Sequence, residues 1–184
     1  KINVKYRILI ADDCSTDGTV DILKKYKRKY PELINLYLRD RNVGMRENAR
    51  LLRQELQAPY IASLEGDDYW INDQKLQIQY DFLKSHEEYS AYASSVYIID
   101  KNNQRNLDLE RCYSNYCYEK DKNFIFFDAL EYKLPGQTAS LMCRNLYKDL
   151  TSIQKEAYDD CRANGDQKLA ILNTLNEKKI YCSK

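Results

Sequence analysis

Residues 8–19 read ILIADDCSTDGT, and this stretch decides the fold that the sequence predicts. The mainly apolar run Tyr6–Ala11 leads into the aspartates Asp12 and Asp13, which is typical of a strand buried on both faces of a parallel sheet. Turn-forming residues follow up to position 18, and Thr19–Tyr30 then carries apolar side chains at helical spacing until Pro31 ends the pattern. The stretch therefore predicts a strand, a turn and a helix in succession.

The same succession recurs twice in the first half of the chain. A strand is predicted at Ile34–Leu38 with a helix at Arg46–Leu56, and another strand at Tyr60–Leu64 with a helix at Asp73–Ser85. Repeated strand–helix units specify an α/β protein with an open, mostly parallel sheet flanked by helices and right-handed crossovers.

The second half has a less regular pattern. Strands are predicted at Tyr89–Ile99, Thr138–Cys143 and Lys179–Cys182, and helices at Phe124–Lys133, Asn145–Ser152 and Asp166–Leu175; Asp108–Asn123 is either a mobile loop or a hairpin. We expect one domain over residues 1–184, with a nucleotide-binding half at 1–88 and a second half at 89–184. Because the chain starts close to one core strand and stops on another, we expect it to be truncated at both ends.

The amino-acid composition limits the kinds of catalysis and binding that the chain can support. The formal net charge of +1 gives no strong field for nucleic acid, and no apolar run reaches the roughly 20 residues of a membrane span, so we expect a cytoplasmic protein. His86 is the sole histidine, which excludes multi-histidine metal sites within the chain. Neither GxGxxG nor GxxxxGK[ST] occurs. Catalysis must therefore rest on carboxylates, with a hard metal as the candidate cofactor.

The six cysteines are scattered, and free thiols are the expected state in a domain that can build its own core. Cys112 and Cys117 are the only close pair. Because no histidine lies near them, a zinc site is disfavoured, and their redox state is left open.

Two predicted strands end in aspartate pairs, Asp12-Asp13 and Asp67-Asp68. Ligands of open α/β sheets bind at the carboxyl ends of the strands. If the two strands are neighbours, four carboxylates converge on one crevice, and we expect a cation such as Mg²⁺ or Mn²⁺, or hydrogen-bond donors from a ligand, to offset their repulsion. The alternative is that both pairs only form turns, since aspartate is common after strands.

These segments resemble family 2 glycosyltransferases of the GT-A fold. Residues 8–19 are similar to the family's second-strand signature, and YIASLEGDDYW at Tyr60–Trp70 to the segment with its metal-binding D-x-D-type motif. Further similar segments follow in the family's order: Asn42-x-Gly44-x-x-x-Asn48, Lys75-Leu76-x-x-Gln79, Leu134–Thr138, Met142–Arg144 and Asn164-Gly165-Asp166.

The resemblance implies an inverting, metal-assisted hexosyltransferase that uses Mn²⁺ or Mg²⁺. Its donor would be a nucleotide sugar, expected to be UDP-linked, and its acceptor a glycan or a lipid-linked sugar, as in polysaccharide and cell wall biosynthesis. Such a protein would work in the cytoplasm, with contact to the inner face of the membrane where lipid-linked acceptors reside as an alternative location.

The resemblance also implies a role for each site residue. Asp13 would bind the nucleotide base and Asp12 would support that loop. Asp67 would contact the ribose or the sugar, and Asp68 would ligate the metal. Asp166 would be the catalytic base that deprotonates the acceptor hydroxyl.

Several alternatives stay open. Glu65 either replaces the first carboxylate of the D-x-D motif or has no part in it. Asp166 is either the base or a helix N-cap, with Asp159 and Asp160 as rival bases. Trp70 either lines the sugar pocket or packs in the core.

The predicted role of the second half is also open. Tyr113, Tyr116 and Tyr118 either stack against a sugar acceptor or are scattered surface aromatics. The family's usual first strand and helix are not seen before Tyr6, so a catalytically inactive glycan- or nucleotide-binding module is an alternative function. A sugar nucleotidyltransferase is another. A signalling receiver domain is disfavoured because the chain contains no Lys-Pro pair.

Overall fold

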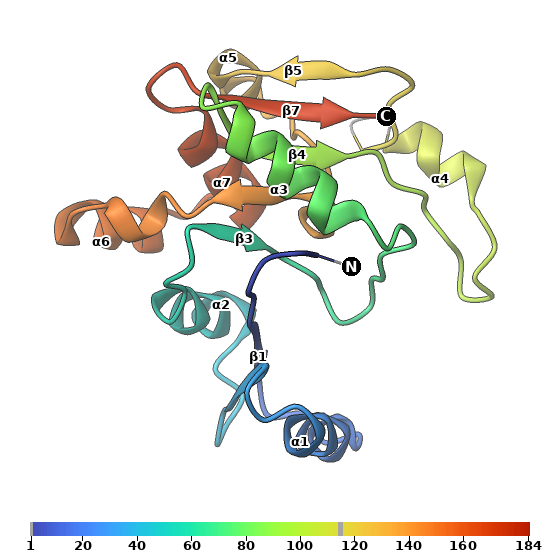
Figure 1. The fold of residues 1–184 in the computed structure, drawn as a ribbon, viewed down its shortest axis with the longest axis vertical. Coiled ribbons are helices and arrows are strands. Elements are labelled where there is room, and N and C mark those ends of the chain that lie inside the picture. The colour runs from blue at the N-terminus through green and yellow to red at the C-terminus, as the bar shows by residue number, and fades with distance from the viewer. Residues whose placement is uncertain (1, 114–115) are drawn as a thin grey trace. The chain divides into compact units, whose positions relative to one another are not determined.

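The computed structural model describes residues 2–113 and 116–184, and the chain divides into two compact units (Figure 1). The smaller unit is Asn3–Gln57, and the larger comprises residues 58–184 with Ile2. The predicted single domain with halves at 1–88 and 89–184 stays a prediction. In the described part of the chain, no helix combines the length and the apolar character that crossing a bilayer requires.

The smaller unit consists of two strand–helix pairs. Its elements are β1 (Ile8–Asp12), α1 (Thr19–Lys29), β2 (Ile34–Leu38) and α2 (Met45–Gln54). β1 and β2 pair in parallel, with Ile8 opposite Ile34 and Asp12 opposite Leu38. Gly18 precedes α1 with a φ of 89°, a left-handed conformation that glycine adopts without a steric cost. The elements predicted here are confirmed to within a few residues.

The larger unit contains a five-stranded sheet in the order β3-β6-β4-β7-β5. Its elements are β3 (Tyr60–Ala62), α3 (Lys75–Ser85), β4 (Tyr89–Ser94), α4 (Leu107–Cys112), β5 (Lys122–Phe124), α5 (Phe126–Leu130), η1 (Thr138–Ser140), β6 (Met142–Arg144), η2 (Tyr147–Asp149), α6 (Ser152–Asp160), α7 (Gly165–Thr174) and β7 (Lys179–Ser183). β4 and β7 are parallel, whereas β6 runs against both β3 and β4, and β5 against β7. The α/β class is confirmed, but this sheet is mixed rather than mostly parallel as expected, since of its pairings β4 with β7 alone is parallel.

Alternate residues of the strands build two apolar layers, one on each face of this sheet. One layer contains Ala91, Ala93, Cys143, Ile180 and Cys182 together with Ala129 of α5 and Ala170 of α7. The other contains Tyr92 and Met142, which pack with Leu83 of α3 and with Tyr181. Figure 1 shows α3 crossing the near face of the sheet and α7 behind it. The larger unit is therefore a three-layer α/β/α arrangement.

The structure differs from the prediction between residues 124 and 160. The expected helix Phe124–Lys133 is shorter, because Lys122–Phe124 pairs with β7 as a strand. The expected strand Thr138–Cys143 begins only at Met142, since Ser140 N–H donates to Gln137 O at 2.9 Å and the backbone closes into a 3₁₀ turn. Helix α6 was not predicted, and a capping box between Thr151 and Gln154 starts it.

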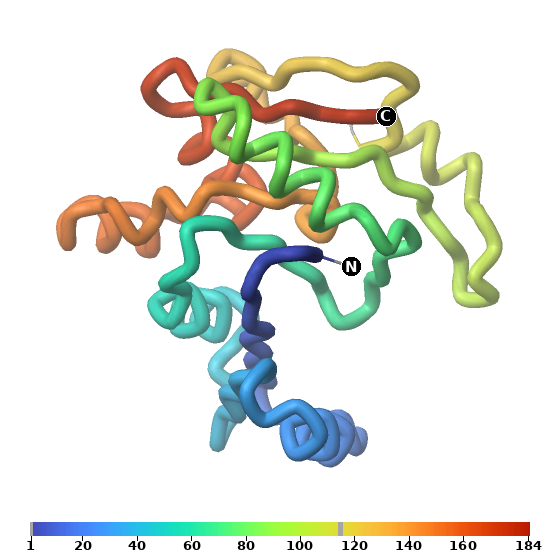
Figure 2. The backbone as a smooth tube through the Cα atoms, in the orientation of Figure 1, coloured from blue at the N-terminus to red at the C-terminus, as the bar shows by residue number. Residues whose placement is uncertain are grey.

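The connection from β4 to β5 contains α4 and can be followed in Figure 2. The strand predicted to reach Ile99 ends at Ser94. The polar turn expected at Lys101–Asn106 is confirmed: Asp100 Oδ1 accepts hydrogen bonds from the N–H groups of Asn102 and Gln104, at 2.8 and 2.9 Å. The segment Asp108–Asn123 contains the helix α4 rather than only a loop or hairpin, and its residues 114–115 lie outside the described part.

Candidate active site

Asp12 and Asp13 lie at the carboxyl end of β1, in the smaller unit. Asp12 is buried, and its Oδ1 accepts the N–H of Ser15 at 2.9 Å. The two carboxylate oxygens of Asp13 accept the N–H groups of Val43 and Gly44, at 2.7 and 2.9 Å. Both aspartates thus order loops, as the turn-forming alternative proposes. Because a carboxylate oxygen has two lone pairs, Asp13 can still accept a hydrogen bond from a ligand.

In the larger unit, the loop after β3 carries Glu65, Asp67 and Asp68. The side-chain nitrogen Nε2 of Gln137 donates to Glu65 Oε2 at 2.6 Å and to Asp68 Oδ2 at 2.8 Å. One nitrogen therefore brings together two carboxylates from a loop 69 residues earlier in the chain. Asp67 is exposed in the same loop, and its predicted contact with ribose or sugar stays a prediction.

The electrostatics of this loop are those of a crowded acidic site. Partial burial raises the pKa of Glu65 above its ordinary value, and the neighbouring carboxylates of Asp68, Asp166 and Asp67 raise it further. The hydrogen bond from Gln137 acts in the opposite direction. Glu65 therefore belongs with Asp68 electrostatically as well as in position.

The donor set fits a hard divalent cation. Glu65 and Asp68 supply carboxylate oxygens that reach a common point, and Mg²⁺ is typically held by one or two carboxylates with water and substrate phosphates completing its shell. Within residues 2–113 and 116–184, no group of three or more His, Cys, Asp or Glu side chains is placed to hold a metal ion. Further ligands would have to come from water or from a diphosphate. The assignment of Asp68 as a metal ligand stays a prediction.

Asp166 is half-buried in the first turn of α7. The N-cap of this helix is Asn164, whose side chain accepts the N–H of Gln167 at 2.7 Å. Asp166 is therefore not the N-cap, and its carboxylate does not close the helix end. Instead, Thr138 Oγ1 donates a hydrogen bond to Asp166 Oδ1. The alternative of Asp166 as an N-cap is wrong.

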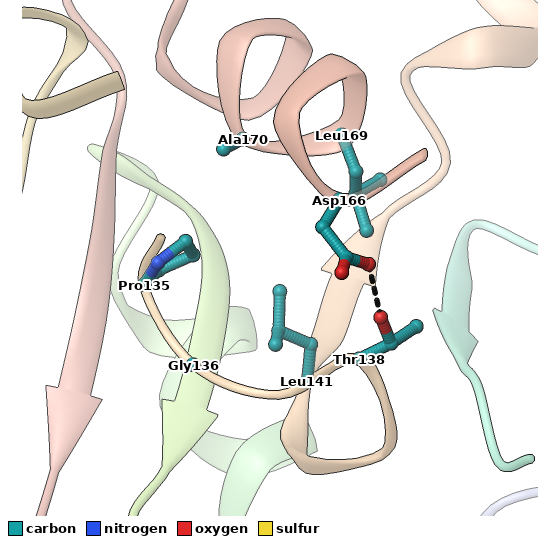
Figure 3. Close-up of a pocket in the computed structure, with 7 residues that line it drawn as sticks. All are labelled: Pro135, Gly136, Thr138, Leu141, Asp166, Leu169 and Ala170. Atoms are coloured by element: carbon teal, nitrogen blue, oxygen red, sulfur yellow. Dashed lines mark hydrogen bonds between the residues drawn. The ribbon is translucent and has the colours of Figure 1, made fainter. Parts of the chain in front are cut away.

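A small pocket opens beside this carboxylate (Figure 3). It is lined by Pro135, Gly136, Thr138, Leu141, Asp166, Leu169 and Ala170. Figure 3 shows the Asp166 carboxylate pointing from α7 toward the Thr138 hydroxyl. The cavity volume of about 10 Å³ is close to the least that holds one water molecule, so a sugar does not fit inside it. An acceptor would approach Asp166 from outside the pocket.

Trp70 and Lys75 form a second polar cluster that contacts the same region. Trp70 Nε1 donates to Ala139 O at 2.7 Å, and the Lys75 ammonium lies 4.7 Å from the centre of the Trp70 ring. Lys75 is buried and donates to Gln79 Oε1 at 2.8 Å, while Gln79 Nε2 donates to Ser140 O, also at 2.8 Å. Burial lowers the pKa of Lys75 to about 8.

The structure places the remaining candidate residues in different surroundings. The Tyr113 and Tyr116 rings stack with centroids 5.9 Å apart, whereas Tyr118 is buried in the core and cannot share one surface with them. Asp159 accepts a hydrogen bond from the Tyr147 hydroxyl at 2.7 Å, and Asp160 is exposed at the end of α6. All six cysteines are free.

Four residues of the site had no predicted role although they lie within the recognised motifs: Gln137, Thr138, Lys75 and Gln79. For Lys75 and Gln79 a signal existed. Their spacing of four residues places them on one helix face with Leu83, and all three are buried. For Gln137 and Thr138 no local pattern indicates contacts with residues so distant in the chain.

Comparison with known proteins gives the context. The family model described as glycosyl transferase family 2 matches residues 2–150. An uncharacterized protein of Mycobacterium tuberculosis is 29% identical over 159 residues, which cover 85% of this chain and 41% of that protein. WfaP of Escherichia coli, a UDP-Glc:alpha-D-GlcNAc-diphosphoundecaprenol beta-1,3-glucosyltransferase, is 33% identical over 94 residues, covering 51% of this chain and 35% of WfaP.

Among solved structures, the crystal structure of S. aureus TarS matches with a TM-score of 0.63 and 17% sequence identity, over all of this chain and 53% of that one. This likeness confirms the predicted GT-A-like α/β fold. The chain spans less than half the length of the curated relatives it matches.

Proposed function

Because the chain belongs to glycosyl transferase family 2, we propose that it carries the sugar-transfer site of a glycosyltransferase that uses a nucleotide-sugar donor and a glycan or lipid-linked acceptor. The reaction proposed is an inverting displacement at the anomeric carbon, assisted by Mn²⁺ or Mg²⁺.

One observation carries the proposal. Two adjacent residues of a single turn contact the candidate metal ligand and the candidate base, since Gln137 holds Asp68 and Thr138 holds Asp166. The acidic loop after β3 and the start of α7 therefore meet at one place in the larger unit. A diphosphate leaving group and a deprotonating carboxylate are needed at the same place for a single displacement.

In the proposed mechanism, Asp166 accepts the proton of the acceptor hydroxyl. The acceptor oxygen then attacks the anomeric carbon from the face opposite the diphosphate, and the bond from that carbon to the diphosphate oxygen breaks. Thr138 holds Asp166 Oδ1, so the second carboxylate oxygen is the one that would face the acceptor. Attack opposite the leaving group inverts the configuration at that carbon.

Glu65 and Asp68 are the residues that would hold the cation. A divalent ion held by them would supply positive charge to offset the charge that develops on a departing diphosphate. Asp13 and Asp12 belong to the smaller unit, and their proposed contact with the nucleotide rests on the family resemblance. WfaP is named for a UDP-linked donor and a lipid diphosphate acceptor, which supports a UDP-sugar and a lipid-linked acceptor as the first substrates to test.

The test combines binding and turnover. The chain is titrated calorimetrically with a panel of UDP- and GDP-sugars in the presence and absence of Mn²⁺, and released nucleoside diphosphate is measured with candidate acceptors. Asp166→Asn should keep donor binding and lower transfer by about 10²–10⁴-fold, the usual contribution of a general base. Unchanged turnover would remove Asp166 from the mechanism.

Asp68→Ala addresses the donor side. It should abolish metal-dependent donor binding, and retained binding would exclude Asp68 as a metal ligand. A wild-type chain that binds donors but transfers to no acceptor would instead favour a catalytically inactive binding module. Consumption of a sugar phosphate and a nucleoside triphosphate would favour a nucleotidyltransferase.

A further inference from the structure

The turn Gln137–Ser140 contacts a different part of the candidate site with each of its residues. Gln137 donates to Glu65 and Asp68, Thr138 donates to Asp166, Ala139 O accepts from Trp70, and Ser140 O accepts from Gln79. A shift of the turn therefore changes the surroundings of both the acidic loop and the catalytic-base candidate.

The orientation of the Gln137 amide is fixed by its two ends. Its Oε1 accepts the N–H of Ala139 at 2.5 Å and so caps the 3₁₀ turn. Its Nε2 then faces the two carboxylates, which have only acceptors to offer and which need a donor. Hydrogen bonds to ionised groups are roughly twice as strong as those between neutral groups, so this nitrogen is held firmly.

The same nitrogen lies where a shared cation would lie. Nε2 is 2.6 Å from Glu65 Oε2 and 2.8 Å from Asp68 Oδ2. Mg²⁺ binds carboxylate oxygens at about 2.0–2.1 Å. An ion that bound these two oxygens from the side of the amide would therefore overlap Nε2.

We propose that Gln137 is a positioning residue that occupies the shared cation position in the free protein, and that a divalent cation must displace its amide to reach Glu65 and Asp68 together. Because Thr138 is the next residue, displacement of Gln137 moves the turn that holds Asp166. This inference deepens the proposed function and rests on it, because the proposed sugar transfer is the reason for a cation at this position.

The chain contains a probe for this movement. Trp70 is its single tryptophan, and its indole N–H is bonded to Ala139 in the turn. The experiment titrates the chain with MgCl₂ alone at constant ionic strength, and follows binding by calorimetry and the turn by Trp70 fluorescence. Wild type should bind Mg²⁺ with a matching change in Trp70 emission.

Two variants of Gln137 distinguish competition between its amide and Mg²⁺ from a general disruption of the turn. Gln137→Ala removes the competing donor and should bind Mg²⁺ about tenfold more tightly, the low end for hydrogen bonds to a charged group, with a reduced fluorescence change. Gln137→Glu keeps an acceptor for the Ala139 N–H and adds a third carboxylate, so it should bind more tightly still. Gln104→Ala is the control and should match wild type, because within the described residues that exposed side chain donates only to Asn102 O, at 3.5 Å.

Far-UV circular dichroism in EDTA shows whether each variant folds. If Gln137→Ala does not fold, Gln137→Leu replaces it, because leucine also lacks the amide donor but fills more of the space of the glutamine side chain. Mg²⁺ affinities that stay equal to or fall below wild type would overturn the proposal, as would a wild type that binds no Mg²⁺ or shows no change in Trp70 emission. Nucleotide-sugar binding measured in parallel separates the two hypotheses. Donor binding with unchanged Mg²⁺ affinities would end this inference alone, whereas the predicted order of affinities without donor binding would end the proposed function alone.

Discussion

Replacing Lys75 by methionine tests how strongly the interior of the larger unit disfavours a charge. The ammonium is buried against Trp70, and Gln79 is the hydrogen-bond acceptor it meets in the described part of the chain. Methionine keeps an unbranched stem of similar length but cannot be protonated. The variant therefore removes the charge and leaves most of the packing in place.

The magnitude follows from the pKa of Lys75, which burial lowers from 10.5 to about 8. At about 1.36 kcal/mol per pH unit, protonated Lys75 at pH 7 costs the folded state about 3 kcal/mol relative to the unfolded chain. Between pH 8 and 10.5 the unfolded chain binds the proton and the folded chain does not, so stability rises with pH. By pH 9.5 roughly 2 kcal/mol of the cost is relieved.

Lys75→Met lacks this rise. At pH 7 the variant is stabilised because it no longer buries a charge. It is also destabilised by about 1–3 kcal/mol, because Gln79 Oε1 loses its hydrogen-bond donor. Its free energy of unfolding should therefore be similar to that of wild type or slightly higher. The decisive quantity is the change of that difference with pH. Relative to wild type, the variant should lose about 2 kcal/mol between pH 7 and 9.5.

The assay is urea unfolding followed by far-UV circular dichroism at several pH values in that range. Titration of the tyrosines is common to both proteins and cancels in the difference. Lys84→Met is the matched control, because Lys84 is exposed on the same helix, and its difference from wild type should stay flat. Parallel profiles for wild type and Lys75→Met would show that the ammonium is not desolvated and would refute the reasoning.

Two further predictions concern the backbone near the site. Gly136→Ala places a Cβ 2.9 Å from Ser140 Oγ and should destabilise the fold by about 1–3 kcal/mol. In Gly165→Ala the added Cβ has, among the described residues, no heavy atom within 4 Å beyond its chain neighbours and its own helix backbone, so the variant should be neutral or stabilised by up to about 1 kcal/mol. Equal midpoints of the two variants in thermal unfolding would contradict this. Asp13→Asn leaves one acceptor for the N–H groups of Val43 and Gly44 and should cost about 1–3 kcal/mol in urea unfolding, with faster amide exchange at one of the two; unchanged exchange at both would show that the contact is dispensable.

The sequence predicted the first three strand–helix pairs well because each strand is a short apolar run and each helix is bounded by glycine, proline or a polar turn. It predicted the second half less well. Thr138 is β-branched and favours a strand in isolation, but Gln137 closes the backbone into a 3₁₀ turn there. Helix α6 is nine residues long and has few apolar side chains, so its apolar periodicity is weak, although the Thr151-x-x-Gln154 capping box was a signal for it.

The sequence predicted the carboxylates of the candidate site but not its neutral residues. Asp68 and Asp166 follow recognisable motifs, and the structure places both against one turn. Gln137 contacts Glu65 across 72 residues of chain, and no local spacing encodes such a pairing. Asp12 and Asp13 belong to the smaller unit, so the predicted convergence of all four aspartates on one crevice stays a prediction.

The turn between α5 and β6 sets a limit on how this chain can change in length. Each residue from Gln137 to Ser140 has its own contact, and Gly136 before them leaves no room for a Cβ. One residue inserted in the turn would move each later residue along by one place. The amide, the hydroxyl and the carbonyl groups would then no longer face their present partners. Among the described residues, the exposed tip (Lys101–Gln104) of the polar turn at Lys101–Asn106 bonds only with its own neighbours, so added residues should be tolerated there. Variation in length should therefore collect there and be absent from the turn.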